Sequence, residues 1–303
     1  MGEVWTDSER RHDFKLLFDV TDGNPNGDPD AGNLPRVDPE TMQGLVTDVA
    51  IKRKVRNWVT ATRKDEAPWR IYVQNRGIAL NTLHQEAYTA TGLKSTGSRQ
   101  SRKDVEQARR WMCEQFFDVR TFGAVMSTGV NCGQVRGPVQ IGFARSVDPI
   151  TPLDLSITRV AVTEQAQAEV VVNEQGEGAG GKQTEMGRKA LVPYGLYVAV
   201  GQVSPLFARD TGFGDEDLAL FWEALIRCWD MDRSAARGVM CCRGLHVFTH
   251  TSPYGDAPAH ELLDRVRVSR REGVEAPRRF ADYRVEIDRV GLPEGVTLTS
   301  LVG

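Results

Sequence analysis

The apolar residues of this chain come in short runs, each about the length of one strand. The run Leu196–Val200 is typical, and it falls far short of the roughly 20 apolar residues that span a bilayer. Strand-like runs such as Phe14–Thr21 alternate with amphipathic segments, of which 215–231 is the clearest helix because its apolar residues recur every three or four positions. The order strand, helix, strands, helix, strand predicts an α+β fold with a ferredoxin-like ground plan and long insertions.

Turn and cap residues set the expected bounds of the other elements. The first strand stops at Asp22–Pro29, a stretch dense in Asp, Asn, Gly and Pro. Ser101 is a good N-cap for a helix over 102–117. Residues 75–100 are expected to be irregular, and a Gly-rich tip is expected at 176–181. The remaining expected elements are a helix from Pro39 or Glu40 to about Thr60, a short strand over 70–74, and strands over 139–145, 158–163, 168–172, 190–203 (broken near Pro193) and 242–249.

Composition narrows the class of protein. The chain has 303 residues, 40% hydrophobic and 26% charged, which suits one large globular domain or two ordinary ones. Its 38 basic and 41 acidic residues give a net charge of −3, which excludes a histone-like polycation but not a local basic groove. The five cysteines lack the spacing of a disulfide framework, which indicates that they are reduced thiols. The first residues lack the basic and apolar regions of a signal peptide, so we expect a cytoplasmic protein with no membrane partner.

Three motifs resemble ligand sites, and each is incomplete. Residues 22–30 match the opening of a calcium loop, but Asn33 stands where the bidentate Glu should be. Residues 176–182 match a phosphate-binding loop, but Gln183 replaces the Ser or Thr that holds magnesium. The cysteines and histidines of 241–250 are spaced too far along a strand to share one zinc ion. We therefore expect no metal, no cofactor and no catalytic set.

Positive charge is the most informative feature for function. Residues 50–64 contain six basic residues and no acidic one. In a helix, Arg53 and Arg56 lie roughly 60° apart with Lys52 beside them, and the apolar residues of 42–49 precede them on the same face. Such a face suits either solvent or a phosphate backbone, and three further features favour the second.

The first of these features is a second group of five basic residues between 99 and 110. The second is the stretch 126–137, whose small residues, amides and hydroxyls let backbone N–H groups approach phosphates closely. The third is Met186, which has basic neighbours near the Gly-rich tip, an arrangement that suits insertion between the bases of a single strand. An acidic stretch over 209–223 would also let copies of the chain stack on one another.

Several blocks of this sequence, in order from about residue 14 to 290, resemble a known family. The blocks are Phe18–Pro29, Thr47–Asn57, Asp118–Met126, Gly133–Gln140, Ser146–Ile150, Gly187–Gly195 and Asp232–Gly238. They are similar to those of the guide-RNA-binding backbone subunit of type I-C CRISPR Cascade complexes, which belongs to the RAMP superfamily.

The resemblance implies a single domain over 1–303, with a modified RRM-like palm, helical fingers at about 61–117 and a β-hairpin thumb at about 158–193. Such subunits polymerise along the spacer of a CRISPR RNA, and each thumb flips one base out of the guide. The implied partners are CRISPR RNA, copies of the chain, other Cascade subunits and target DNA, in prokaryotic antiviral defence. Base pairing reads the target while the protein holds the backbone in shape.

The expected RNA contacts come from the turn after the first strand, the basic helix, the small-residue stretch and the thumb. They are Asn24, Asn26, Lys52, Arg53, Arg56, Arg120, Met126, Ser127, Thr128, Gln134, Arg136, Met186, Arg188 and Lys189.

Two other functions stay open on the sequence. Related backbone subunits of type III complexes cut RNA with an acidic loop residue, so Asp22, Asp28 or Asp30 could serve a metal-dependent endoribonuclease. A DNA-binding protein that acts without RNA would carry duplex-binding motifs, and none is present. The expected function is therefore that of a non-catalytic structural subunit assembled on RNA.

Overall fold

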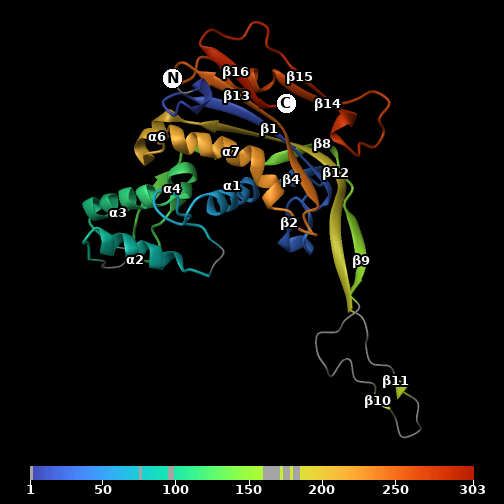
Figure 1. Ribbon diagram of the computed structural model, residues 1–303, viewed down its shortest axis with the longest axis horizontal. Helices are drawn as coiled ribbons and strands as arrows, with labels where there is room; N and C mark the ends of the chain where they lie inside the picture. The colour runs from blue at the N-terminus through green and yellow to red at the C-terminus, as the bar shows by residue number, and fades with distance from the viewer. Residues whose placement is uncertain (1–2, 75–76, 95–98, 160–170, 173–177, 180–184) are drawn as a thin grey trace.

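The fold is built on one eight-stranded antiparallel sheet (Figure 1). The computed structural model describes residues 3–74, 77–94, 99–159, 171–172, 178–179 and 185–303. The strand order is β16-β13-β1-β12-β8-β4, and β7 and β9 also pair with β12. These strands are β1 (His12–Gly23), β4 (Gln43–Val46), β7 (Val139–Ile141), β8 (Ala144–Pro149), β9 (Leu153–Arg159), β12 (Glu185–Val203), β13 (Val239–His250) and β16 (Val296–Val302).

Helices and small hairpins complete the described part of the chain. The helices are α1 (Asp48–Thr62), α2 (Leu80–Ala90), α3 (Arg102–Gln115), α4 (Phe117–Phe122), α6 (Pro205–Thr211), α7 (Asp215–Met231) and α8 (Ala259–Leu263), with short 3-10 turns η1 (Val4–Thr6), η2 (Pro29–Ala31) and η3 (Phe280–Asp282). The two-stranded pairs are β2 (Gly27–Asp28) with β3 (Leu34–Pro35), β5 (Gly123–Val125) with β6 (Gln134–Arg136), β10 (Val171–Val172) with β11 (Gly178–Ala179), and β14 (Val266–Arg270) with β15 (Tyr283–Ile287).

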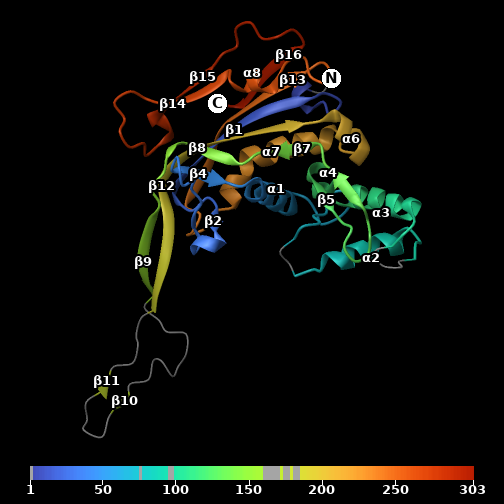
Figure 2. The same cartoon turned by 180° about the vertical axis from the view of Figure 1, so that it is seen from behind.

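The main core lies between the sheet and the two long helices α1 and α7, which pack side by side on one of its faces (Figures 1 and 2). Phe14 on β1 meets Trp222 of α7 edge to face with ring centroids 5.1 Å apart, and Phe18 stacks on Trp229 at 4.6 Å. Burial of each such ring contributes about 1.5–3 kcal/mol, which holds α7 against the sheet. The helix predicted over 215–231 is confirmed with the same bounds.

The connectivity confirms the expected fold class. The elements β1, α1, β8, β12, α7 and β13 follow one another in the βαββαβ order, and β13, β1, β12 and β8 are neighbours in the sheet. This is the ferredoxin-like ground plan of an α+β fold. Its insertions include α2 and α3, the long hairpin of β9 and β12, and the hairpin of β14 and β15.

The helix expected from Pro39 or Glu40 begins later, so that prediction is wrong at its N-terminal end. Gln43–Val46 instead form β4, which pairs with β8. A Cβ atom on Gly44 would collide with the Tyr197 hydroxyl, so the chain passes closely over β12 at this point. The Thr47 side chain then caps α1 by accepting a hydrogen bond from the Ala50 N–H at 3.3 Å. The apolar pattern of 42–49 therefore belongs mainly to a strand.

Three other expectations about the insertions are wrong in detail. Residues 75–100, expected to be irregular, contain the helix α2. The helix expected over 102–117 divides in two because Phe116 has extended backbone angles between α3 and α4. The strand expected over 70–74 is reduced to a single bridge between Arg70 and Phe116.

β12 continues through Pro193, where a break was expected. The neighbouring strand β1 pairs with Tyr194 and Val192 on either side of this proline, and Asp22 opposite it has a φ of 50° and forms no pair. A proline is tolerated in a strand at such an irregularity, where the ladder between β1 and β12 skips a residue.

β12 also forms a hairpin with β9 that projects away from the sheet (Figures 1 and 2). The pairing runs from Leu153 opposite Leu191 to Arg159 opposite Glu185, so the strand expected at 158–163 begins earlier. Most of the Gly-rich tip at 176–181 and most of the strand expected at 168–172 lie outside the described residues. The division of the chain into palm, fingers and thumb stays a prediction.

All five cysteines are free thiols, as the spacing indicated. In the portions of the chain that the structure describes, no helix is both long and apolar enough to cross a membrane.

Candidate nucleic-acid interface

A groove of about 700 Å³ opens beside the C-terminal end of β1. Its walls are the turn that follows β1, the first two turns of α1, and residues 232–238, which we call the 232–238 loop. Three of the sequence-predicted RNA contacts line this groove, namely Asn24, Asn26 and Arg53.

The two asparagines shape the wall of the groove. The Asn24 N–H donates to the Ala236 carbonyl at 2.8 Å, and its side-chain amide donates to the Asn33 carbonyl at 2.7 Å. Asn26 Oδ1 accepts hydrogen bonds from the Thr47 N–H and hydroxyl, both at 2.9 Å. These bonds tie the turn after β1 to the 232–238 loop and to the start of α1, so the groove is fixed before a ligand arrives.

Two polar atoms at the groove have no hydrogen-bond partner in the described part of the chain. They are Asn24 Oδ1, an acceptor on a side chain only 7% exposed, and Arg36 Nε, a donor. A buried polar group left without a partner costs about 1–3 kcal/mol. A polar ligand in the groove, or water, would relieve this cost.

The positive charge of the groove comes from Arg53 and from three cations that we did not predict as contacts: Arg36, Lys54 and Arg237. Arg53 donates to the Val73 carbonyl at 2.8 Å, and burial together with the nearby Arg56 lowers its pKa. Arg36 and Arg237 are partly exposed. Arg36 lies 3.5 Å from the Asp28 carboxylate, and Arg237 lies 3.0 Å from that of Asp232.

Lys54 is the buried member of this set. Its ammonium pairs with Asp232 and lies 5.6 Å from the centre of the Trp229 ring. Burial lowers its pKa, and Asp232 opposes that effect. Asp232 also forms an ion pair with Arg237, so one carboxylate holds two cations at the edge of the groove. In the sequence, these residues could have been found from the Asp232–Gly238 block and from the many basic residues of the segment that forms α1.

Hydrophobic side chains at the groove are exposed. Phe143 lines it with 57% of its surface accessible, and Val49 lines it with 64% accessible. Sequence reasoning missed Phe143, because an apolar residue at the end of a strand pattern is more often part of the core. An exposed aromatic ring beside cations is a suitable surface for a nucleic-acid base.

The structure places Arg56 and Arg120 away from the groove. Arg56 is 7% exposed and donates to Asp118 at 2.7 Å, while Asp118 also accepts from two backbone N–H groups. Arg120 is 4% exposed and makes a two-pronged ion pair with Asp217 at 2.6 and 2.9 Å. Both guanidinium groups are neutralised inside the fold, so we leave them out of the proposed RNA contacts.

Lys52 and the small-residue stretch also lie apart from the groove. Lys52 pairs with Asp48 at 2.8 Å on the adjoining surface of α1. Met126 is completely buried in a cluster with α2 and α3. The other four predicted contacts of this stretch are half-buried or exposed around β5 and β6: Ser127, Thr128, Gln134 and Arg136.

The remaining predicted contacts lie on the projecting hairpin. Arg188 is exposed and pairs with Asp154 across the two strands. Lys189 stands opposite Leu155. The backbone of Met186 pairs with Thr158, but its side chain lies outside what the structure describes.

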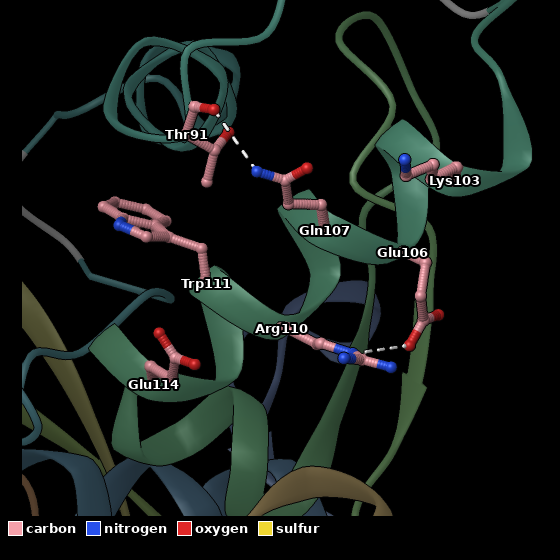
Figure 3. A pocket seen from close by; sticks show the side chains of 7 residues that line it. All are labelled: Thr91, Lys103, Glu106, Gln107, Arg110, Trp111 and Glu114. Carbon is pink, nitrogen blue, oxygen red and sulfur yellow. Dashed lines mark hydrogen bonds and ion pairs between the residues drawn. The ribbon is translucent and has the colours of Figure 1, made fainter.

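A second hollow, of about 440 Å³, lies on α3 beside Thr91 (Figure 3). Arg110 and Trp111 line it together with Glu106 and Glu114. Arg110 pairs with Glu106 at 3.2 Å, and Arg109 also pairs with Glu106 and with Asp210, so hydrogen bonds from Arg109 lower the pKa of Glu106. Two members of the basic group of 99–110, Arg109 and Arg110, are thus matched by carboxylates.

One acidic residue of the turn after β1, Asp28, helps to order the backbone. Asp28 Oδ1 accepts from the Asp30 N–H at 3.2 Å and lies 3.5 Å from Arg36. In the ranges that the structure describes, no group of three or more His, Cys, Asp or Glu side chains is arranged to hold a metal ion.

Comparisons with known proteins place this chain in a family. Residues 10–288 match the family model described as "CRISPR-associated protein Cas7". A curated protein of that description from Haloferax volcanii is 32% identical over 120 residues, which are 39% of this chain and about a third (32%) of that protein's length.

Solved structures with a similar arrangement include two described as CRISPR RNA-guided surveillance complexes. Their TM-scores are 0.48 and 0.41, with 15% and 16% identity, covering 82% of this chain and 79% and 71% of theirs. A type III-B Cmr-beta complex bound to cognate target RNA has a TM-score of 0.39 at 11% identity, over 79% of this chain and 61% of the other. Because the family model spans nearly the whole sequence, the chain belongs to the Cas7 family of CRISPR-associated proteins.

Proposed function

We propose that this chain is a backbone subunit of a type I-C Cascade complex, which polymerises along the spacer of a CRISPR RNA and supports its pairing with target DNA in antiviral defence. Family membership supports the CRISPR setting. The observation that carries the RNA-binding role is the groove beside β1, which combines cations, an exposed aromatic ring and buried polar atoms that have no hydrogen-bond partner among the described residues.

Each part of the groove suits one part of a single strand. Arg53 and Arg237 would contact phosphates, which position a strand without reading its sequence. Phe143 would stack on a base, a contact that tolerates any base because each has a flat π-face. The other partners that we propose are further copies of this chain and the other Cascade subunits.

Replacing Arg53 and Arg237 together by Gln should weaken RNA binding for every sequence and lower the salt slope of log K by about 1.4, since each lost phosphate contact on a single strand removes about 0.7. Phe143→Ala should weaken binding by about 1–3 kcal/mol and leave the slope unchanged. Fluorescence anisotropy at several salt concentrations measures both quantities. The matched control is Arg209→Gln, an exposed arginine paired with Glu9 outside the groove. Equal slopes for the double variant and the wild type would remove the groove from the RNA site.

We propose further that the subunit holds RNA without cutting it, since the Asp28 carboxylate is already engaged within its turn by the Asp30 N–H and by Arg36. Radiolabelled RNA incubated with the wild-type chain and Mg²⁺ should stay intact on a denaturing gel, and Asp22→Ala, Asp28→Ala and Asp30→Ala should leave that result unchanged. Mg²⁺-dependent cutting by the wild type that one of these changes abolishes would favour the endoribonuclease alternative instead.

A further inference from the structure

The C-terminal part of the chain carries a dense group of arginines. Residues 265–289 contain eight arginines, no lysine and five acidic residues, although the whole chain has a net charge of −3. Most of these arginines lie on β14, on β15 and on the loop that joins them. Arginine is the cation best suited to phosphate, because its planar guanidinium stays charged and can donate two parallel hydrogen bonds.

The hairpin of β14 and β15 covers the face of the sheet opposite α1 and α7 (Figures 1 and 2). Tyr197 of β12 packs in the core with the long helices, whereas Leu196 packs with Tyr283 of β15. Successive side chains of a strand point to opposite faces, so the two clusters lie on opposite sides of the sheet. The arginines of this hairpin are therefore separate from the groove beside β1.

Two neighbouring hollows follow the line between β8 and β14, which we call the β8–β14 seam. The first, of about 670 Å³, is lined by Val147 and Arg267. The second, of about 310 Å³, is lined by Asp148, Arg270 and Arg278. Arg267 and Arg270 are three residues apart on one strand, or about 10 Å at roughly 3.3 Å per residue.

The guanidinium groups in the seam are held mainly by backbone carbonyls. Arg267 donates to the Asp264 carbonyl at 3.2 Å, Arg278 to the Pro277 carbonyl at 2.9 Å, and Arg270 to the Glu275 carbonyl at 2.9 Å. A carbonyl fixes the direction of a guanidinium but does not neutralise its charge. In the described ranges, neither Arg267 nor Arg278 forms an ion pair with a carboxylate, and Arg270 has only Asp148 at 3.9 Å.

Carboxylates in the seam moderate this charge. Glu286 lines the first hollow, but it pairs with Arg284 at 2.9 Å. Asp264 and Glu275 also line the two hollows. The positive field is consequently modest, and any anion bound here should dissociate readily as the salt concentration rises.

We propose that the β8–β14 seam binds the phosphate backbone of a single DNA strand while RNA occupies the groove on the other face. The proposal rests on the proposed function, because pairing of a guide RNA with one strand of a duplex displaces the other as a single strand. The aromatic rings at the seam, Tyr194 and Tyr283, are 6% and 5% exposed, so they offer no surface for bases. Recognition would be through phosphates and independent of sequence.

The test uses the full chain saturated with unlabelled RNA and titrated with fluorescent oligo-dT, which cannot pair with a guide that lacks adenine. The double variant Arg267→Gln/Arg278→Gln should bind oligo-dT about tenfold more weakly, with a salt slope lower by about 1.4. The matched control Arg209→Gln/Arg279→Gln removes two exposed arginines outside the seam that already pair with Glu9 and Asp282, and it should change the slope little.

RNA affinity and thermal unfolding are measured on the same preparations, and both variants should match the wild type. Absence of oligo-dT binding by the RNA-loaded wild type would overturn the seam proposal while leaving the groove intact. An equal loss in the control variant, or equal competition by oligo-glutamate of the same charge, would also overturn it. Failure of the wild type to bind RNA would count against the proposed function. Because RNA is added before DNA, this failure is distinguished from a failure of the seam to bind DNA.

Discussion

Replacing Arg120 by Met should destabilise the fold by about 3–5 kcal/mol, because it leaves the Asp217 carboxylate buried without its charge partner. Asp217 also accepts from the Gly214 N–H at 3.1 Å at the start of α7, so the loss would reach the helix that forms the core. Urea unfolding followed by far-UV circular dichroism measures the change. The protein that stays folded should bind RNA with unchanged affinity.

Two variants sharpen this prediction. Arg209→Met breaks an exposed ion pair with Glu9 and should cost less than about 1 kcal/mol, which separates burial from pairing as the cause. Arg120→Met combined with Asp217→Leu should recover part of the lost stability, since no charge is then left buried. Normal stability of Arg120→Met together with lost RNA binding would instead make Arg120 an RNA contact.

Lowering the pH from 7 to about 4 should destabilise the chain strongly through two buried histidines. Burial lowers the pKa of both His12 and His246 to about 4, whereas an unfolded histidine titrates near 6.5. Between these values the unfolded state binds more protons than the folded one, so stability is present above pH 6.5 and is lost as the pH falls towards 4. At about 1.4 kcal/mol per unit, each histidine contributes roughly 3 kcal/mol at neutral pH.

The pH effect can be assigned with single variants. His246 has Nδ1 at 2.9 Å from the Ser300 hydroxyl and no partner for Nε2 among the described residues, so we expect His246→Leu to preserve the fold. Because His12 remains, this variant should lose about half as much stability as the wild type between pH 6.5 and 4. His260 is exposed, and His260→Asn should keep the wild-type profile. Urea midpoints measured across this pH range decide the matter. A His246→Leu profile as steep as the wild type would show that other groups cause the loss.

Periodicity in the sequence was sufficient where the apolar pattern of an element is long and regular in itself, even though the element packs on distant parts of the chain. The stripe of α7 gave its bounds, and the apolar run that opens β1 gave the central strand of the sheet. The start of α1 could not be predicted in this way, because residues 43–46 become a strand only by pairing with β8, about a hundred positions later. The helical spacing of the apolar residues in 42–49 favoured a longer helix.

Charge was harder to interpret than hydrophobicity, since the role of a cation depends on partners far away in the sequence. Arg56 and Arg120 are neutralised by Asp118 and Asp217, which lie 62 and 97 positions further along the chain. Arg237 enters the groove only because the 232–238 loop packs against the end of β1. Sequence spacing therefore indicated a helix that lines the groove, but it could not separate the buried arginines, Arg56 and Arg120, from the accessible ones.

Assembly along RNA is tested most directly by native mass spectrometry of the wild-type chain mixed with unstructured RNAs of increasing length. The number of copies per RNA should rise in equal steps as the RNA lengthens, because each subunit would cover a fixed stretch of backbone. The Arg53→Gln/Arg237→Gln variant should lose the longer assemblies first. A stoichiometry that stays the same at every RNA length would contradict a backbone subunit that polymerises along its guide.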